Sequence, residues 1–469
     1  MMRAASRWLL VFVCGGGIGA LVAHRGPAIA VEPPVSEESS NSPATKPIQE
    51  TVNSIANCMT SGCHGASDGK APIWQRAGRI WFDEDPHAQA FTNLLSGRSL
   101  AIAENLTKRK YASVDDPNYR KFLRERCTSC HAGPYASESQ LVLGVDCQAC
   151  HGPSAAWGNH HYSEAWKSQL GRRFDGTQMT NTEELTTRAK VCFACHVGDL
   201  RSPTGPREVN HDLMAAGHPA MYVEWEAYWQ AYPAHWNRQK DEERFGKSVA
   251  HRRWQIGNLV QAQSRFDLLL QRCRSISRGE TRSWPELTEY SCYNCHHPLS
   301  YPSWRQSQPA NGTYDWDAWC ITGVRSVTPK TKLAEWEALL IPFEKAIAAH
   351  PPVVTETIRV TEPIVEWIES ALVELGLQPL ASADEIIDEV RAGLLEPLRP
   401  KSWEAAVHWS TGMQARLMAL SRDTNLSESS GSVSATIRES YLDGPEQFEP
   451  SKLYTRRQQL EELFRKTQP

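Results

Sequence analysis

The chain has 469 residues and a formal net charge of −4, with acidic and basic residues interspersed along its length. It contains no basic stripe and no lysine-rich tail, so nucleic acid is not indicated as a partner. The composition is notable for 13 cysteines, 16 histidines and 17 tryptophans, which makes the cysteine- and histidine-bearing segments the first candidates for function.

The first 30 residues have the features of a secretory signal peptide. Arg3 and Arg7 precede an apolar run from Trp8 to Ala23, and Ala28-Ile29-Ala30 supplies the small-x-small pattern of a cleavage site. The run is short for a bilayer span of ~20 residues, but an uncleaved segment that tethers the protein to the membrane remains an alternative. We therefore expect export to the periplasm.

Residues 31–50 are rich in Pro, Ser and Glu and have almost no apolar side chains to bury. This composition predicts a disordered linker between the signal and the folded protein.

Five closely spaced cysteine pairs, each followed at once by histidine, lie between residues 58 and 296. This is the attachment pattern of haem c: two thiols add across the two vinyl groups of one porphyrin, and the adjacent imidazole binds its iron. The cysteines are Cys58 and Cys63, Cys127 and Cys130, Cys147 and Cys150, Cys192 and Cys195, and Cys292 and Cys295; the histidines are His64, His131, His151, His196 and His296. The sequence therefore predicts five haem c groups.

Structural zinc is the competing explanation for paired cysteines, and the interval between Cys130 and Cys147 would suit a zinc ribbon. Zinc does not explain why histidine follows all five pairs, whereas haem attachment requires it. The first pair, Cys58 and Cys63, encloses four residues instead of two. A disulfide or an unmodified pair is therefore an alternative at that motif.

Two further cysteines, Cys273 and Cys320, lie outside the motifs and the signal. In an oxidising compartment we expect them to form a structural disulfide around the fifth motif. A thiolate ligand to iron is the alternative.

The spacing of the motifs predicts a loop-rich, mainly helical domain over residues 51–325. The motif histidines are 67, 20, 45 and 100 residues apart, which excludes a simple tandem repeat. Turn-rich segments separate them and strand alternation is scarce, so the core is expected to be stacked haems with side chains packed around them. One long helix is expected over 249–275, where apolar residues recur every three or four positions.

Residues 326–469 lack cysteine and predict a helical C-terminal domain. Trp336 to Phe343 and Ile364 to Leu375 carry apolar residues at helical spacing, and Ser382 with Glu385 predicts a capping box. Two more helices are expected at Trp403–Leu420 and Leu453–Phe464. We expect this domain to pack against the haem region, with a partner-docking module as the alternative.

Histidines outside the motifs matter because a second imidazole closes the open face of a haem iron. The candidates within the haem region are His87, His160, His161, His211, His218, His235, His251 and His297. Apolar flanks and nearness to a motif favour His87, His211, His218 and one of His160 and His161. His235 and His251 are equally compatible with a surface position, and His297 is expected to point away from the iron bound by its neighbour.

The segments GVDCQACHGP, CFACHVGD and VNHDLMAAGHPAMYVEW resemble the multihaem family of cytochrome c554 and c-prime over roughly residues 55–300. The resemblance implies a mostly helical fold around closely stacked haems and a periplasmic electron carrier. It also implies that His87, His211 and His218 occupy distal-ligand positions. A fifth motif, an expanded first motif and the C-terminal residues depart from the four-haem pattern.

These observations favour electron transfer through five covalently held haems, with redox proteins as donor and acceptor. The alternative is a multihaem oxidoreductase that acts on a small nitrogen or sulfur compound at one five-coordinate haem. A third possibility is a haem-bearing sensor or scaffold whose C-terminal helices report the redox state to a partner.

Overall fold

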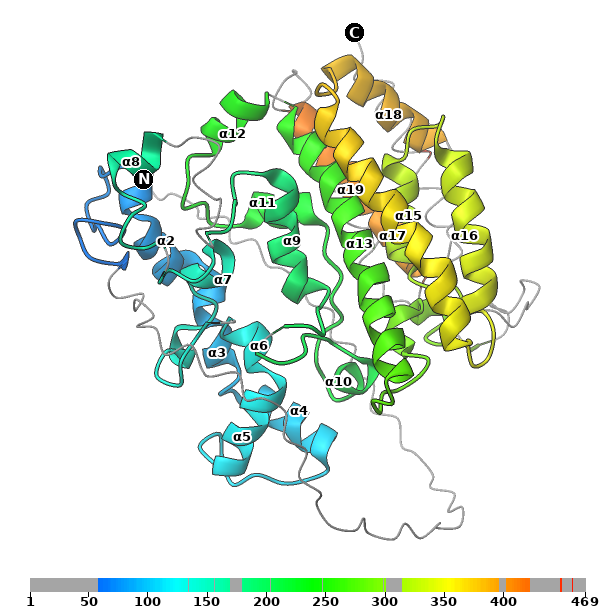
Figure 1. The fold of residues 1–469 in the computed structure, drawn as a ribbon, viewed down its shortest axis with the longest axis horizontal. Coiled ribbons are helices and arrows are strands. Elements are labelled where there is room, and N and C mark those ends of the chain that lie inside the picture. The colour runs from blue at the N-terminus through cyan, green and yellow to red at the C-terminus, as the bar shows by residue number, and fades with distance from the viewer. Residues whose placement is uncertain are drawn as a thin grey trace. The chain divides into compact units, whose positions relative to one another are not determined.

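The computed structural model describes residues 58–421 except 134, 156, 169–178, 203, 247, 298, 301–313 and 396–401, together with residues 448 and 458. The described residues form helices and no strand, so the prediction of a mainly helical fold is confirmed (Figure 1). The signal and linker segments, and all but one residue of the helix expected at 453–464, lie outside the described residues. None of the described helices is long and apolar enough to cross a membrane.

The haem-motif region begins with short helices joined by turns. Asp85, Asp116 and Asp146 cap three of these helices, each through a backbone N–H two residues further on. The α-helices are α2 Ala77–Glu84, α3 Ala90–Asn93, α4 Gly97–Thr107, α5 Pro117–Arg126, α6 Thr128–His131, α7 Cys147–His151 and α8 Glu164–Ser168; the 3₁₀ helices are η1 Ile73–Gln75, η2 Pro86–Gln89 and η3 Leu141–Leu143.

Apolar burial among these short helices is limited to small clusters. One cluster gathers six buried residues, among them Tyr119 and Leu123, and another holds only Trp81 and Ala88. Short helices with so little shared core need another source of cohesion, which is what a core of haem groups would provide.

A second group of helices follows, and its long member organises the fold. These elements are α9 Leu185–His196, α10 His211–Ala215, α11 Trp225–Ala231, α12 Arg238–Phe245, α13 Val249–Ser277, η4 Leu287–Glu289 and η5 Cys292–Asn294. The helix expected over 249–275 is α13, and 21 of its 29 residues are buried. Helices α9, α15, α17 and α19 all pack against it (Figure 1).

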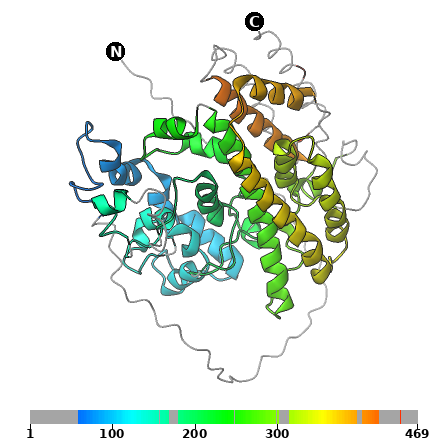
Figure 2. The same ribbon diagram turned by 45° about the horizontal axis from the view of Figure 1, so that its top comes forward.

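The C-terminal helices complete this core. They are α15 Ala318–Val327, α16 Leu333–Ile347, α17 Val354–Leu377, α18 Ala383–Leu395 and α19 Trp403–Ser421. The apolar face expected from Trp336 to Phe343 is buried, and α16 packs on α17, which runs along α13 (Figure 2). The capping box is present: the Ser382 hydroxyl accepts from the Glu385 amide at 3.2 Å, and the Glu385 carboxylate accepts from the Ser382 amide at 2.7 Å.

One cluster of buried apolar residues runs from Leu185 in α9 to Leu375 in α17. It therefore crosses residue 325 without interruption, and the C-terminal helices share their core with the helix that carries the fourth motif. Cys273 and Cys320 belong to this cluster as buried free thiols, so the expected disulfide between them is not formed.

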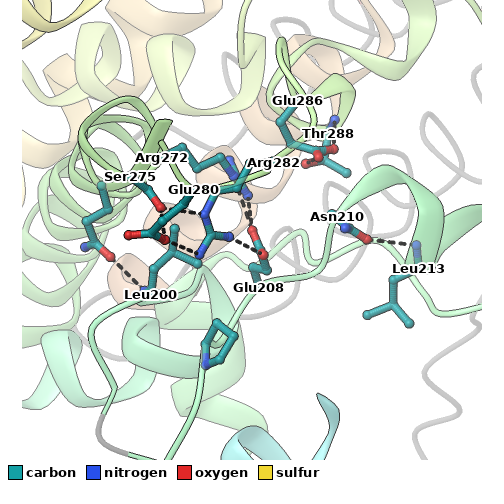
Figure 3. Close-up of polar contacts among 12 residues, drawn as sticks. Leu200, Glu208, Asn210, Leu213, Arg272, Ser275, Glu280, Arg282, Glu286 and Thr288 are labelled. Carbon is teal, nitrogen blue, oxygen red and sulfur yellow. Dashed lines mark hydrogen bonds and ion pairs between the residues drawn. The ribbon is translucent and has the colours of Figure 1, made fainter. Parts of the chain in front are cut away.

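An ion-pair network fixes the chain between the fourth and fifth motifs to α13. The buried Arg272 guanidinium lies 3.1 Å from the Glu208 carboxylate and also pairs with Glu289. Arg282 donates to the other oxygen of Glu208 at 3.0 Å, so one carboxylate joins two guanidinium groups (Figure 3). The backbone N–H of His211 donates to Glu286 at 2.8 Å in the same region.

Candidate haem sites

Four of the five motifs place their cysteines and histidine on one turn of helix or 3₁₀ helix. The third motif forms α7, the fourth ends α9, and the second straddles the start of α6. In the second and fifth motifs the backbone N–H of the histidine donates a hydrogen bond to the carbonyl oxygen of the first cysteine, at 3.1 Å and 2.7 Å. A single turn therefore gathers the groups that one porphyrin needs.

The expanded first motif returns to the same geometry through a wider loop. The backbone N–H of His64 donates to the Cys58 carbonyl oxygen at 3.0 Å despite the two additional residues. Gly65 closes this loop, because a Cβ atom there would lie 1.8 Å from the Met59 carbonyl oxygen. The insertion bulges outward and leaves the relation between the first cysteine and the histidine intact.

Four motif histidines each face one histidine from outside the motifs. The ring centroids are 6.1 Å apart for His64 and His161, 6.5 Å for His131 and His218, 6.3 Å for His151 and His235, and 6.2 Å for His196 and His87. Two imidazoles that share one metal ion through bonds of about 2 Å hold their ring centres about 6 Å apart. Each pair is thus spaced to hold one iron between its rings.

Hydrogen bonds at Nδ1 orient most of these imidazoles. Backbone carbonyl oxygens accept from His64, His131, His161 and His218 at 2.6–2.9 Å. His87 donates instead to the Asp85 carboxylate at 2.9 Å. An acceptor on Nδ1 leaves Nε2 as the nitrogen that can bind iron.

Burial favours the neutral, metal-binding form of several of these imidazoles. It lowers the pKa of both His151 and His196 to about 4, and it also lowers the pKa of His131 and His218. His87 is different: although burial lowers its pKa, the hydrogen bond and charge of Asp85 raise it overall. Burial alone would raise the pKa of Asp85, but hydrogen bonds from His87 and Tyr232 outweigh burial, so the pKa lies below its ordinary value.

Cysteines of different motifs approach one another inside this region. A hydrogen bond with Cys195 raises the pKa of Cys130, so the second and fourth motifs touch. Burial is the main cause that raises the pKa of Cys147, and the charge of Cys58 is the second. Burial also comes first for Cys150, and the charge of Cys192 is the second cause that raises its pKa. Thiols of the first and third, the third and fourth, and the fourth and second motifs therefore lie near enough to influence one another electrostatically.

The remaining predicted ligands lie elsewhere. His160 is exposed, and in the described part of the chain neither it nor His211 shares a ring contact with a motif histidine. Buried His251 faces the Glu389 carboxylate at 3.2 Å, and His297 lies beside Tyr293. His296 of the fifth motif is exposed and has no ring partner among the described residues.

His235 is the member of the four pairs that sequence reasoning did not favour. It follows α11 in the short PAHW segment, 84 residues after its partner His151. Nothing in its local pattern distinguishes it from a surface histidine. The one available signal was the aromatic run around it, since Tyr232 and Trp236 both contact its ring.

Comparison with known proteins gives one match. The family model for cytochrome c554 and c-prime matches residues 61–152 and 146–217, which include four motif histidines and the segment up to Gly217. The fifth motif and the helices from α11 onward lie beyond the matched residues. No curated protein and no solved structure matches the chain.

Proposed function

Because the family model for cytochrome c554 and c-prime matches residues 61–217, we propose that the chain is an exported carrier that passes electrons through five covalently bound haem c groups. The family identifies it as a c-type cytochrome of electron transfer that exchanges electrons with redox partners. The observation that supports the carrier function most strongly is the set of four histidine pairs at iron-spanning distance.

The proposal assigns each pair to one haem. The first haem is attached to Cys58 and Cys63, the second to Cys127 and Cys130, the third to Cys147 and Cys150, the fourth to Cys192 and Cys195, and the fifth to Cys292 and Cys295. Their axial imidazoles are His64 with His161, His131 with His218, His151 with His235, His196 with His87, and His296 for the fifth. Haem supplies one-electron redox chemistry, and the protein supplies orientation, insulation from water and tuning.

Two imidazoles on one iron suit a carrier. With haem bound, each pair would supply both imidazoles to one iron, which would leave no position for a substrate and would favour a low-spin iron. The nearness of thiols from different motifs supports haems that lie close together, because each thioether would fix the edge of its porphyrin. We propose that electrons pass along the row formed by the first, third, fourth and second haems.

A periplasmic location would suit the same function. Covalent haem attachment belongs to the compartment outside the cytoplasmic membrane, and the family's proteins are typically periplasmic. We propose a periplasmic location, with the signal-like residues 1–30 cleaved or kept as a tether.

The fifth motif supports a second candidate function. His296 lacks a ring partner among the described residues, so its haem is the place where a small nitrogen or sulfur compound would bind if the protein were an oxidoreductase. A high-spin iron that binds nitric oxide and disappears in H296A would favour this alternative.

Haem stoichiometry tests the proposal. Mass measurement and a pyridine haemochrome assay on protein from an exporting host should give five haems, and four after Cys58→Ala with Cys63→Ala. An unchanged haem count in that variant would refute attachment at the first motif, and a colourless wild-type protein would refute the proposed function itself.

A further inference from the structure

Asp85 is a buried carboxylate directed at one distal imidazole. Its side chain is completely inaccessible to solvent, and it precedes Pro86 at the N-cap of η2. One of its oxygens accepts from both the backbone N–H and the Nδ1 of His87, each at 2.9 Å. The other oxygen accepts from the Tyr232 hydroxyl. The carboxylate is therefore held in one position by three donors.

The packing around His87 leaves this contact little freedom. Gly144, at φ +67°, runs so close to His87 that a Cβ atom there would lie 2.4 Å from the His87 carbonyl oxygen. Val145 donates to the same oxygen at 2.9 Å. Gly144 and Val145, which precede the third motif, therefore fix the backbone of His87, the proposed distal ligand of the fourth haem.

The acceptor at His87 differs in charge from those at the other distal imidazoles. His161 donates to the Gly158 carbonyl and His218 to the Pro219 carbonyl, and both acceptors are neutral, while the buried Nδ1 of His235 has no hydrogen-bond partner among the described residues. Only at His87, among the described distal imidazoles, is the acceptor an anion. A charge-assisted hydrogen bond is roughly twice as strong as a neutral one.

Tyr232 lies against two distal ligands at once. Its ring centroid is 5.7 Å from that of His87 and 6.2 Å from that of His235, which belong to the fourth and third haems. Its hydroxyl shares the Asp85 carboxylate with His87. Tyr232 therefore competes with His87 for the negative charge of Asp85.

We propose that Asp85 is a tuning residue that lowers the reduction potential of the fourth haem below those of its neighbours, and that Tyr232 limits this effect. The inference rests on the proposed assignment of His87 and His196 to one iron. An anionic acceptor draws the Nδ1 proton toward itself and makes the imidazole a stronger electron donor, which favours ferric over ferrous iron. The fourth haem is then the low-potential step between the third and second haems.

Potentiometric titration monitored by EPR tests this in the intact five-haem protein. In D85N the amide oxygen is a neutral acceptor, so the reduced-to-oxidised ratio of one haem at a fixed potential should rise about tenfold, an upward shift of ~59 mV for one electron. Y232F should move the same haem the opposite way, because the carboxylate then bonds to His87 alone. Opposite shifts at one haem are not expected from a merely structural role.

D116N is the matched control. Asp116 also precedes a proline and caps a helix through the amide two residues on, at 2.8 Å, but it is only half-buried and, among the described residues, it contacts no histidine. The reduction potentials of the haems in D116N should remain those of the wild type. Equal shifts in D85N and D116N, or a downward shift in D85N, would overturn the proposal.

The haem count and the spin state distinguish a failure of the tuning role of Asp85 from a failure of the ligand assignment on which that role rests. If D85N keeps five haems and a low-spin fourth iron but its potential is unchanged, the tuning role is wrong and the ligand assignment stands. If H87A produces no new high-spin iron, the assignment itself is wrong. Y232F decides the tuning role should D85N fail to fold.

Discussion

An imidazole can bind iron through either nitrogen, and the hydrogen bond at the other nitrogen decides which one. At His161 the Gly158 carbonyl accepts from Nδ1 at 2.8 Å, whereas the neighbouring His160 is exposed. Two adjacent histidines thus have different environments, and this difference makes the ligand assignment testable residue by residue.

We predict that H161A opens the sixth position of the first haem and converts one iron from low-spin to high-spin. H160A should leave the spin state of every iron as it is in the wild type, because the His160 side chain reaches no motif histidine among the described residues. EPR spectra of the two oxidised variants make the comparison. Identical spectra would contradict the pairing of His161 with His64.

Local patterns in the sequence specify the proposed attachment residues, whereas the proposed distal ligands come together only through folding. Cys147, Cys150 and His151 are adjacent in the chain, so one pattern specifies them. His235 meets His151 only through folding, and no local pattern encodes that approach. His87 and His218 stood out by their flanks and do face motif histidines, while His211 had the same kind of flanks and faces none in the described residues.

At the scale of elements, the first motif depends on one glycine. We predict that G65A disrupts the loop of the first motif, because its new Cβ would lie 1.8 Å from the Met59 carbonyl. Mass measurement should show loss of the first haem in much of the protein. G62A is the control, since nothing lies within 4 Å of a Cβ at Gly62. Full loading of G65A would show that the loop tolerates the side chain.

The ion-pair network on α13 gives a stability prediction. R272A leaves the Glu208 and Glu289 carboxylates without their buried partner, which should cost about 3–5 kcal/mol of unfolding free energy. R359A removes an exposed pair with Glu356, which water and salt screen, and should leave the free energy of unfolding nearly unchanged. Denaturant unfolding at matched haem content measures both. Similar losses in the two variants would contradict a stabilising role for the network.

The buried N-cap of α11 predicts how stability depends on pH. Burial raises the pKa of Glu224 from its ordinary value of 4.5 to about 8. Between pH 4.5 and about 8 the Glu224 carboxyl is deprotonated in the unfolded chain but stays protonated in the folded chain. Glu224 therefore makes the free energy of unfolding fall as the pH rises over this range. Unfolding free energies should decline less steeply over that range in E224Q. Equal slopes in both proteins would refute the prediction.

Helix periodicity predicted which faces would be buried but not what would cover them. The apolar stripe from Trp336 to Phe343 marked α16 correctly, and Ser382 with Glu385 marked the start of α18. Periodicity does not identify the partner of a stripe. The expectation of a disulfide failed for a related reason: Cys273 and Cys320 are covered by the shared core and remain thiols.

Over the whole molecule, α13 joins the haem-motif region to the C-terminal helices. It packs against α9, which carries the fourth motif, and against α19, which also contacts η5 of the fifth motif. The Tyr293 backbone N–H donates to Glu404 of α19 at 3.2 Å. The cysteine-free helices thus hold the fifth motif within the same core as the fourth. A sequence boundary at residue 325 marks where the motifs end, and the shared core continues past it.

Above all, the four histidine pairs are proposed to hold one iron each between two imidazoles. EPR spin quantitation of the oxidised wild-type protein, purified from an exporting host, tests this assignment most directly. We predict at least four low-spin irons per chain, held by His64 with His161, His131 with His218, His151 with His235 and His196 with His87. Fewer than four low-spin irons in fully loaded protein would contradict it.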